Sequence, residues 1–193
     1  MTWFRMPLLL WALYATALIQ VLATPVLAIT LLMLIVERVF LIGLFDPAMG
    51  GDPVLFQHFF WFYSHPAVYV LVLPVFGIFS ELFPVYARKP LFGYRFVAIA
   101  SFGITFLSLI VWVHHMFYSG TPMWMRNLFM ATTMLIAVPT GVKVFAWLGT
   151  LWKGNLRLNT PMLFCLGGLF NFIFAGITGV MLATVPIDVH VGN

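Results

Sequence analysis

Five long apolar stretches constrain this chain of 193 residues more than any other feature of its sequence. Each has about the 20 apolar residues that a helix needs to cross the hydrocarbon core of a bilayer. The stretches cover residues 8–36, 54–80, 96–117, 128–151 and 162–185. Their hydrophobicity does not alternate with a period of two, as the strands of a transmembrane β-barrel require. We therefore expect an all-α integral membrane protein with five transmembrane helices, and we assign residues 1–193 to one domain.

The composition excludes several other classes of protein. Hydrophobic residues make up 63% of the chain and charged residues 7%, which is too apolar for a soluble or a disordered chain. Nine Lys and Arg residues outnumber five Asp and Glu residues, but they do not form the basic patch of a nucleic-acid-binding protein. The single cysteine, Cys165, lies in an apolar stretch, which excludes a disulfide framework.

The charges of the loops predict the orientation, because Lys and Arg accumulate in cytoplasmic loops. Three segments share one side of the membrane, and their basic residues are Arg5, Arg88, Lys89, Arg95, Lys153 and Arg157. The segments on the other side hold Arg38 and Arg126 together with Asp46, Asp52 and Asp188. We therefore predict a cytoplasmic N-terminus.

Three histidines lie within the apolar stretches, where an ionisable side chain is costly and indicates function. His65 belongs to the second stretch, and His114 and His115 lie near the outer end of the third. All three imidazoles fall within about two helical turns of one another in depth. They suggest a site for Cu, Zn, Fe or Ni with a coordination position left open. Alternatively, His114 and His115 cap a helix end and His65 is a core histidine.

One metal can bind both adjacent histidines only if their helix is distorted, because neighbouring residues on an α-helix point about 100° apart. Tyr69 follows His65 by four residues, so the two rings share a helix face. A phenol beside a metal-bound imidazole can supply a proton and an electron; otherwise it packs as one aromatic residue among many.

Lys143 lies deep in the fourth stretch, too far from either end to reach the interface with its amine. Thr140 shares its helix face, and Ser80 lies near the cytoplasmic end of the second stretch. Together they suggest a hydrogen-bonded proton path toward the histidines. The alternative is a structural lysine bonded to backbone carbonyls.

Several motifs occur in an ordered set that resembles subunit I of the haem-copper terminal oxidases of the cytochrome c oxidase type. The motifs are Gly51-Asp52-Pro53, Gln57-His58, Trp61, His65-Pro66-x-Val68-Tyr69, His114-His115 and Pro139-Thr140-Gly141-Val142-Lys143. The resemblance covers essentially the whole chain. It implies a twelve-helix bundle of which this chain is an internal part, similar to helices five to nine.

The resemblance implies an oxygen reductase that reduces O₂ to water and translocates protons across the bacterial inner membrane. His65, His114 and His115 would hold the copper ion called CuB, with Trp61 packed beside the site. Tyr69 would be covalently linked to His65 and would donate a proton and an electron.

The same resemblance implies roles for four more residues. Lys143, Thr140 and Ser80 would form the K-type proton path to the tyrosine, and Asp188 would lie near the haem propionates. The axial ligands of the high-spin and low-spin haems would lie outside this chain, so we expect the chain to be inactive on its own.

The sequence departs from the common family pattern at two places. The pattern has Glu where this chain has Ala67, and the preceding Tyr63 and Ser64 resemble a bacterial subgroup whose hydroxyl groups replace that carboxyl group. Many relatives have His-Asp at the positions of Gly192 and Asn193, where a magnesium or manganese site is shared with subunit II.

The implied partners are the rest of subunit I, subunit II with its CuA centre, subunit III, cytochrome c as electron donor and membrane lipid. Two alternatives stay open. A nitric oxide reductase-type relative shares the three histidines but lacks the helix tyrosine and the membrane lysine. A metal-ion transporter would use the histidines as transit ligands and would need more polar residues along a continuous path.

Overall fold

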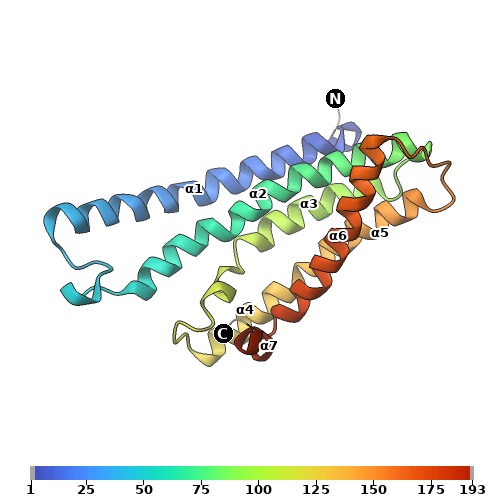
Figure 1. Ribbon diagram of the computed structural model, residues 1–193. Helices are drawn as coiled ribbons and strands as arrows, with labels where there is room; N and C mark the ends of the chain where they lie inside the picture. Colours follow the sequence, from blue (N-terminus) through green and yellow to red (C-terminus); the bar gives the residue numbers. More distant parts are fainter. Residues whose placement is uncertain (1–2, 192–193) are drawn as a thin grey trace.

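The computed structural model describes residues 3–191, which form a bundle of helices without strands (Figure 1). Five segments are long and apolar enough to cross a membrane: Leu8–Phe40, Pro53–Ala87, Tyr94–Met116, Met123–Leu151 and Thr160–Leu182. The prediction of an all-α multi-pass membrane protein is confirmed. Gly192 and Asn193 lie outside the described residues.

The two longest helices form an antiparallel pair along one side of the bundle (Figure 1). They are α1 (Leu8–Phe40) and α2 (Pro53–Ala87). Gly77 of α2 lies against the α1 backbone so closely that an added Cβ would be 2.9 Å from the Cα of Leu9. Small residues at such a crossing let two helices approach without side chains between them.

Carboxylates close both ends of this helix pair. At one end Glu37, which is 2% exposed, accepts the backbone N–H groups of residues 44–46 at 2.9, 2.5 and 3.0 Å. At the other end Glu81 of α2 accepts the N–H groups of Leu8 and Leu9 at 2.6 and 3.4 Å. The first N–H groups of a helix have no partner within the helix, so Glu81 caps α1 from a neighbouring helix.

The third span is not one continuous α-helix. Helix α3 (Tyr94–Ser108) ends before the histidine pair, and the 3₁₀ segment η3 (Trp112–Met116) carries the pair. The hydroxyl groups of Ser101, Thr105 and Ser108 donate to carbonyls three or four residues earlier in α3, at 3.1, 3.0 and 2.7 Å. Such bonds compete with the helical pattern and bend helices.

The fourth span also changes direction inside the bundle. Helix α4 (Met123–Leu135) is followed by α5 (Ala137–Leu151), with the junction at Ile136. Pro139 lies three residues later; its ring clashes with the carbonyl four residues before it and it has no N–H group to donate. The proline therefore accounts for the junction.

The remaining boundaries differ from the expected ranges by a few residues. The second span continues past the expected end at Ser80 to Ala87, and the fourth begins at Met123 instead of residue 128. The last span, α6 (Thr160–Leu182), ends before residue 185, and the short helix α7 (Val185–Val191) follows it. Charged residues lie within one turn of these ends. The apolar stretches expected from the sequence therefore begin or end at positions that differ from the ends of the helices.

A hydrophobic core cluster surrounds Trp147 of α5, which is fully buried. Phe76, Phe79 and Phe83 of α2 contact its ring at centroid distances of 5.2, 5.6 and 6.2 Å. Helix α6 buries only Met162, Cys165 and Leu169. Its outer half instead forms one wall of a cleft.

Candidate metal centre

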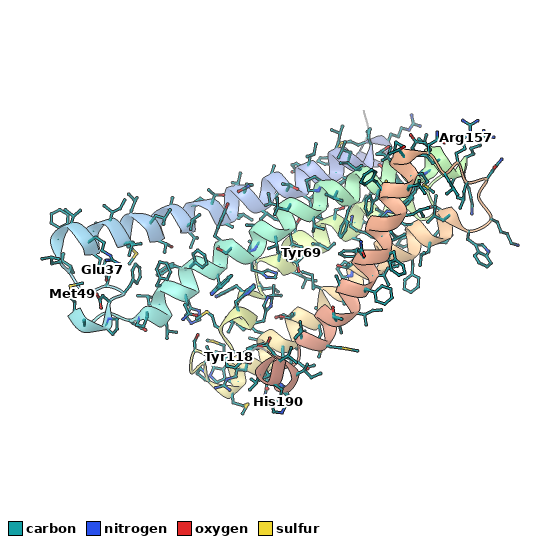
Figure 2. The ribbon with its side chains drawn as sticks, viewed as in Figure 1. Glu37, Met49, Tyr69, Tyr118, Arg157 and His190 are labelled. Atoms are coloured by element: carbon teal, nitrogen blue, oxygen red, sulfur yellow. The ribbon has the colours of Figure 1, made fainter. Side chains whose placement is uncertain are left out.

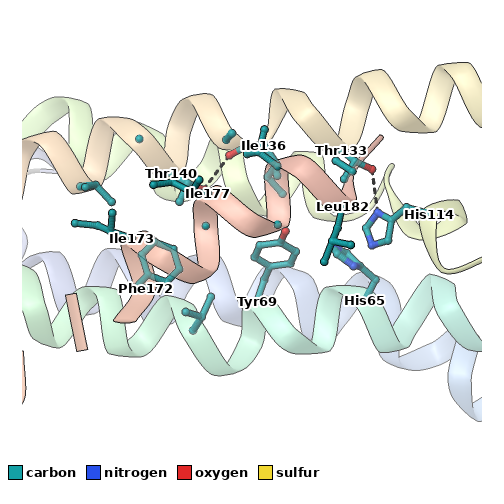
Figure 3. A pocket seen from close by; sticks show the side chains of 18 of the residues that line it. His65, Tyr69, His114, Thr133, Ile136, Thr140, Phe172, Ile173, Ile177 and Leu182 are labelled. Carbon is teal, nitrogen blue, oxygen red and sulfur yellow. Dashed lines mark hydrogen bonds between the residues drawn. The ribbon is translucent and has the colours of Figure 1, made fainter. Parts of the chain in front are cut away.

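Three imidazoles from two elements meet at the end of the cleft where Leu182 lies (Figure 3). His65 comes from α2, and His114 and His115 come from η3. One ring nitrogen of each residue lies within 4.8 Å of the other two. The structure thus brings together the three histidines that the sequence suggested as a metal-binding set.

The break in the third span makes this convergence possible. His65 Nδ1 and His115 Nε2 face each other at 3.1 Å. The ring centroid of His114 lies 4.5 Å from that of His65 and 4.4 Å from that of His115. The two adjacent histidines reach one point because α3 ends before them and the 3₁₀ segment η3 carries them. This is the local distortion that the binding of one metal by both residues requires.

Two neighbours fix the orientation of the imidazoles. The indole of Trp61 stacks on His115 at a centroid distance of 4.0 Å and an angle of 6°. Thr133 of α4 lies 2.9 Å from His114 Nδ1 and donates its hydroxyl hydrogen to Phe129 O at 2.6 Å. Because that hydrogen is used, we assign the proton of His114 to Nδ1, which leaves Nε2 with a free lone pair.

Side chains from α2 and α4 also hold the irregular segment in place. Trp112 donates its indole N–H to His58 Nδ1 at 3.3 Å, and Ser119 donates to Gln57 Oε1 at 3.0 Å. Thr132 donates to the carbonyl of Ile110 at 3.0 Å, in the turn that follows α3. The sequence analysis missed Thr132 and Thr133, because nothing in their spacing shows that α4 packs on the histidine segment.

The donor set fits a metal such as copper. Among the described residues, His65 Nε2 is the one buried side-chain nitrogen or oxygen without a hydrogen-bond partner. A buried unpartnered polar group costs about 1–3 kcal/mol, so a native protein retains one where a ligand or a reaction uses it. Imidazole nitrogens are suited to Cu, Zn, Fe and Ni, and three of them leave a coordination position open.

The cleft beside the histidines has a volume of about 590 Å³, within the range of cofactor pockets. Its lining is mostly apolar and includes Gly141, Gly176 and Gly179, where an added Cβ would meet no atom within 4 Å. A flat apolar group such as a haem fits this space. Of the described histidines, His58 and His190 do not line the cleft, so neither is placed as an axial ligand there.

Tyr69 lies in the middle of the bundle, between Glu37 at one end and Arg157 at the other (Figure 2). Its ring centroid is 4.9 Å from that of His65. Its hydroxyl group is directed across the cleft toward α6 (Figure 3). The expected juxtaposition of the phenol and the histidines is therefore present.

The three residues of the expected proton path are not joined by hydrogen bonds within residues 3–191. Thr140 lines the cleft and donates to Ile136 O at 2.8 Å. Ser80 donates to Phe76 O at 2.7 Å and accepts from Trp147 Nε1 at 2.9 Å. Lys143 donates instead to Ser101 Oγ of α3 at 2.7 Å.

The other predicted residues lie around this centre in different ways. Tyr63 and Ser64 are half-buried on α2 directly before His65, and neither lines the cleft. Asp188 of α7 lines the cleft, and its backbone carbonyl accepts the hydroxyl hydrogen of Tyr118 at 2.5 Å. Burial raises the pKa of the Asp188 carboxyl group above its ordinary value.

Comparison with known proteins agrees with the motifs. The family model for cytochrome c and quinol oxidase polypeptide I matches residues 1–193. The chain is 59% identical over 186 residues to cytochrome c oxidase subunit 1 of Synechocystis sp., covering 96% of this chain and 34% of that protein.

Two further relatives carry the same name. Cytochrome c oxidase subunit 1 of Thermostichus vulcanus is 52% identical over 191 residues, covering 99% of this chain and 35% of the relative. Cytochrome c oxidase subunit 1 of Cereibacter sphaeroides is 46% identical over 188 residues, covering 97% of this chain and 33% of the relative. The chain thus spans about a third of the length of these curated relatives. From its sequence, its five spans and its histidine cluster, the chain belongs to the cytochrome c and quinol oxidase polypeptide I family.

Proposed function

We propose that this chain is the copper-binding part of the catalytic subunit of a respiratory oxygen reductase in a bacterial inner membrane. The full enzyme would carry out O₂ + 4 e⁻ + 4 H⁺ → 2 H₂O and translocate further protons. Electrons would come from cytochrome c through subunit II, with subunit III as a further partner and the N-terminus on the cytoplasmic side. The observation that carries this proposal is the buried histidine cluster at the end of an apolar cleft that Tyr69 also lines.

His65, His114 and His115 would hold the copper ion, and the cleft would hold the high-spin haem. When bound, these two groups supply the binding position for oxygen and the electrons that reduce it. The hydrogen bond from His114 Nδ1 to Thr133 supports this assignment, because it leaves Nε2 available to the metal. The stacking of Trp61 on His115 keeps that ring in place and excludes water from its face.

Tyr69 would deliver a proton and an electron from its phenol group into the cleft. We also propose that a C–N bond joins His65 Nε2 to a ring carbon of Tyr69. Its formation removes two protons and two electrons, which oxygen accepts. Two features support this bond: His65 Nε2 has no hydrogen-bond partner among the described residues, and the two ring centroids are 4.9 Å apart.

Lys143, Thr140 and Ser80 would carry protons from the cytoplasmic side to Tyr69. The position of Thr140 on the same cleft as Tyr69 supports the last step of this path. Tyr63 and Ser64 would replace the carboxyl group of a second proton path, and Asp188, which lines the cleft, would lie near the haem propionates.

The substitution Tyr69→Phe in the full-length, assembled oxidase tests this function. It removes the phenolic proton while keeping the ring, so we expect oxygen consumption to fall by about 100-fold or more with copper content unchanged. Copper is measured by elemental analysis and oxygen with an electrode. Tyr14→Phe, which removes a hydroxyl group at an exposed position of α1 outside the cleft lining, is the matched control. Normal turnover in Tyr69→Phe, or metal flux through the purified protein in vesicles, would contradict the proposal.

A further inference from the structure

Lys143 is held by α3 and, among the described residues, its amine makes no hydrogen bond to Thr140 or Ser80. Its side chain is 1% exposed. The amine donates to Ser101 Oγ at 2.7 Å and to the carbonyl of Val97 at 3.4 Å. It also lies 5.8 Å from the centroid of the Phe76 ring. Apart from Phe76, which also lines the cleft, the groups that contact the buried amine belong to α3.

The hydroxyl group of Ser101 is arranged to accept the amine hydrogen. It donates its own hydrogen to Val97 O at 3.1 Å, so its lone pairs are directed away from that carbonyl. Ser101 is 2% exposed, and no other described side chain bonds to its Oγ. When the lysine leaves, Ser101 keeps its bond to Val97, so departure costs chiefly the bond between Lys143 and Ser101.

We propose that Ser101 and the Val97 carbonyl form a docking position for the amine of Lys143, and that proton delivery to the cleft requires the amine to leave it. This inference rests on the proposed function, in which Lys143 serves Tyr69. Ser101 is then a positioning residue: the strength of its bond sets how often the lysine is available to Thr140.

A pivot of the lysine side chain moves the amine between the docking position on α3 and a position beside Thr140. Four methylene groups separate the amine from the α5 backbone, which gives a wide arc of motion. Thr140 uses its hydroxyl hydrogen on Ile136 O, so its lone pairs can accept from the displaced amine. Weakening the docking position therefore shifts the population of Lys143 toward the cleft.

The test uses Ser101→Ala in the full-length, assembled oxidase. The measured step is the rate at which electrons reach the high-spin haem in the anaerobic enzyme. An electron added to a buried site draws in a proton to balance its charge, and in the proposed function protons reach the cleft through Lys143. We expect the rate to rise about 3- to 10-fold, the effect of losing one net hydrogen bond. A second readout is cryo-electron microscopy of the variant, in which the amine should no longer contact Val97 O.

Two control variants show whether the effect is specific to the bond between Ser101 and Lys143. Thr30→Ala removes a buried hydroxyl group that donates to the carbonyl four residues earlier in α1 and does not contact Lys143, and it should leave the rate and the amine position unchanged. Ser101→Thr keeps the hydroxyl group and should behave as the unaltered protein. If Ser101→Ala does not assemble, Ser101→Cys offers a weaker acceptor of similar size and should raise the rate in the same direction.

Three results would overturn the inference or separate it from the proposed function. A Ser101→Ala enzyme identical to Thr30→Ala in rate and amine position would overturn the docking position. A rate as low as that of Lys143→Met would also overturn it, because Ser101 would then conduct protons. If Lys143→Met turns over normally, the proposed proton path fails, while the amine position in Ser101→Ala still decides whether Ser101 docks the lysine.

Discussion

Two polar clusters lie deep in this bundle, and they differ in how their atoms are satisfied. Two of the three clustered histidines sit on an irregular segment, and His65 Nε2 has no partner among the described residues. The lysine cluster lies between the regular helices α3 and α5, and Ser101 and Val97 satisfy its amine. The first cluster therefore still has a nitrogen available for a bond, which in the proposed function is the bond to Tyr69, and one ring nitrogen of each histidine lies close enough to the others to share a metal ion. The second is complete, so it can act only by moving.

The largest expected effect breaks the first cluster. His114→Ala in the full-length oxidase removes one of three ligands, so the loss of copper affinity should exceed the 10- to 100-fold that outer partners contribute. Copper content by elemental analysis and oxygen consumption should both fall to background. His190→Ala, at an exposed position outside the cleft lining, should change neither. Retention of full copper in His114→Ala would refute the assignment of that residue as a ligand.

A smaller loss is expected from breaking the second cluster. Lys143→Met keeps the length of the side chain and removes the amine, so copper should remain bound while oxygen consumption falls by about 100-fold. Lys153→Met, at an exposed lysine beyond the end of α5, is the matched control. Loss of copper in Lys143→Met would show that the two clusters are not independent and would undo the comparison.

The smallest expected effect distinguishes the metal ligands from the residues that hold them in place. Thr133→Val preserves the shape of the side chain but removes the acceptor for His114 Nδ1, so copper affinity should fall by about 10- to 100-fold. A competition titration with a copper chelator measures this change. Thr133→Ser restores the hydroxyl group and should recover most of the affinity; failure to do so would mean that the methyl group, not the hydrogen bond, matters.

The five spans were predictable because a bilayer sets a minimum length for apolar helices. The identities of the three histidines and Tyr69 were also predictable, because each is unusual for its place in an apolar stretch or follows another by one helical turn. The point at which the three imidazoles meet was not predictable, because it depends on the end of α3 at Ser108. No glycine or proline marks that end, and the hydroxyl groups of Ser101, Thr105 and Ser108 are the local signal that was available.

The partner of Lys143 could not be read from the sequence for a different reason. Ser101 lies 42 residues earlier in the chain, and the face that α3 turns toward α5 depends on tertiary packing. The spacing of Thr140 and Lys143 was read correctly as one shared helix face. However, a shared face does not show that the hydroxyl group of Thr140 bonds instead to the carbonyl of Ile136.

The two carboxylates that close the α1–α2 pair bear on how the chain enters the membrane. Glu81 finds the N–H groups of Leu8 and Leu9 only when the two helices lie side by side, and Glu37 finds its donors only after the intervening loop has folded back. Before the helices pair and the loop folds back, the two carboxylates lack the hydrogen-bond donors that compensate for their transfer out of water. Lateral release of the first span into lipid is thus expected to wait for the second. During synthesis the two helices would insert as one hairpin.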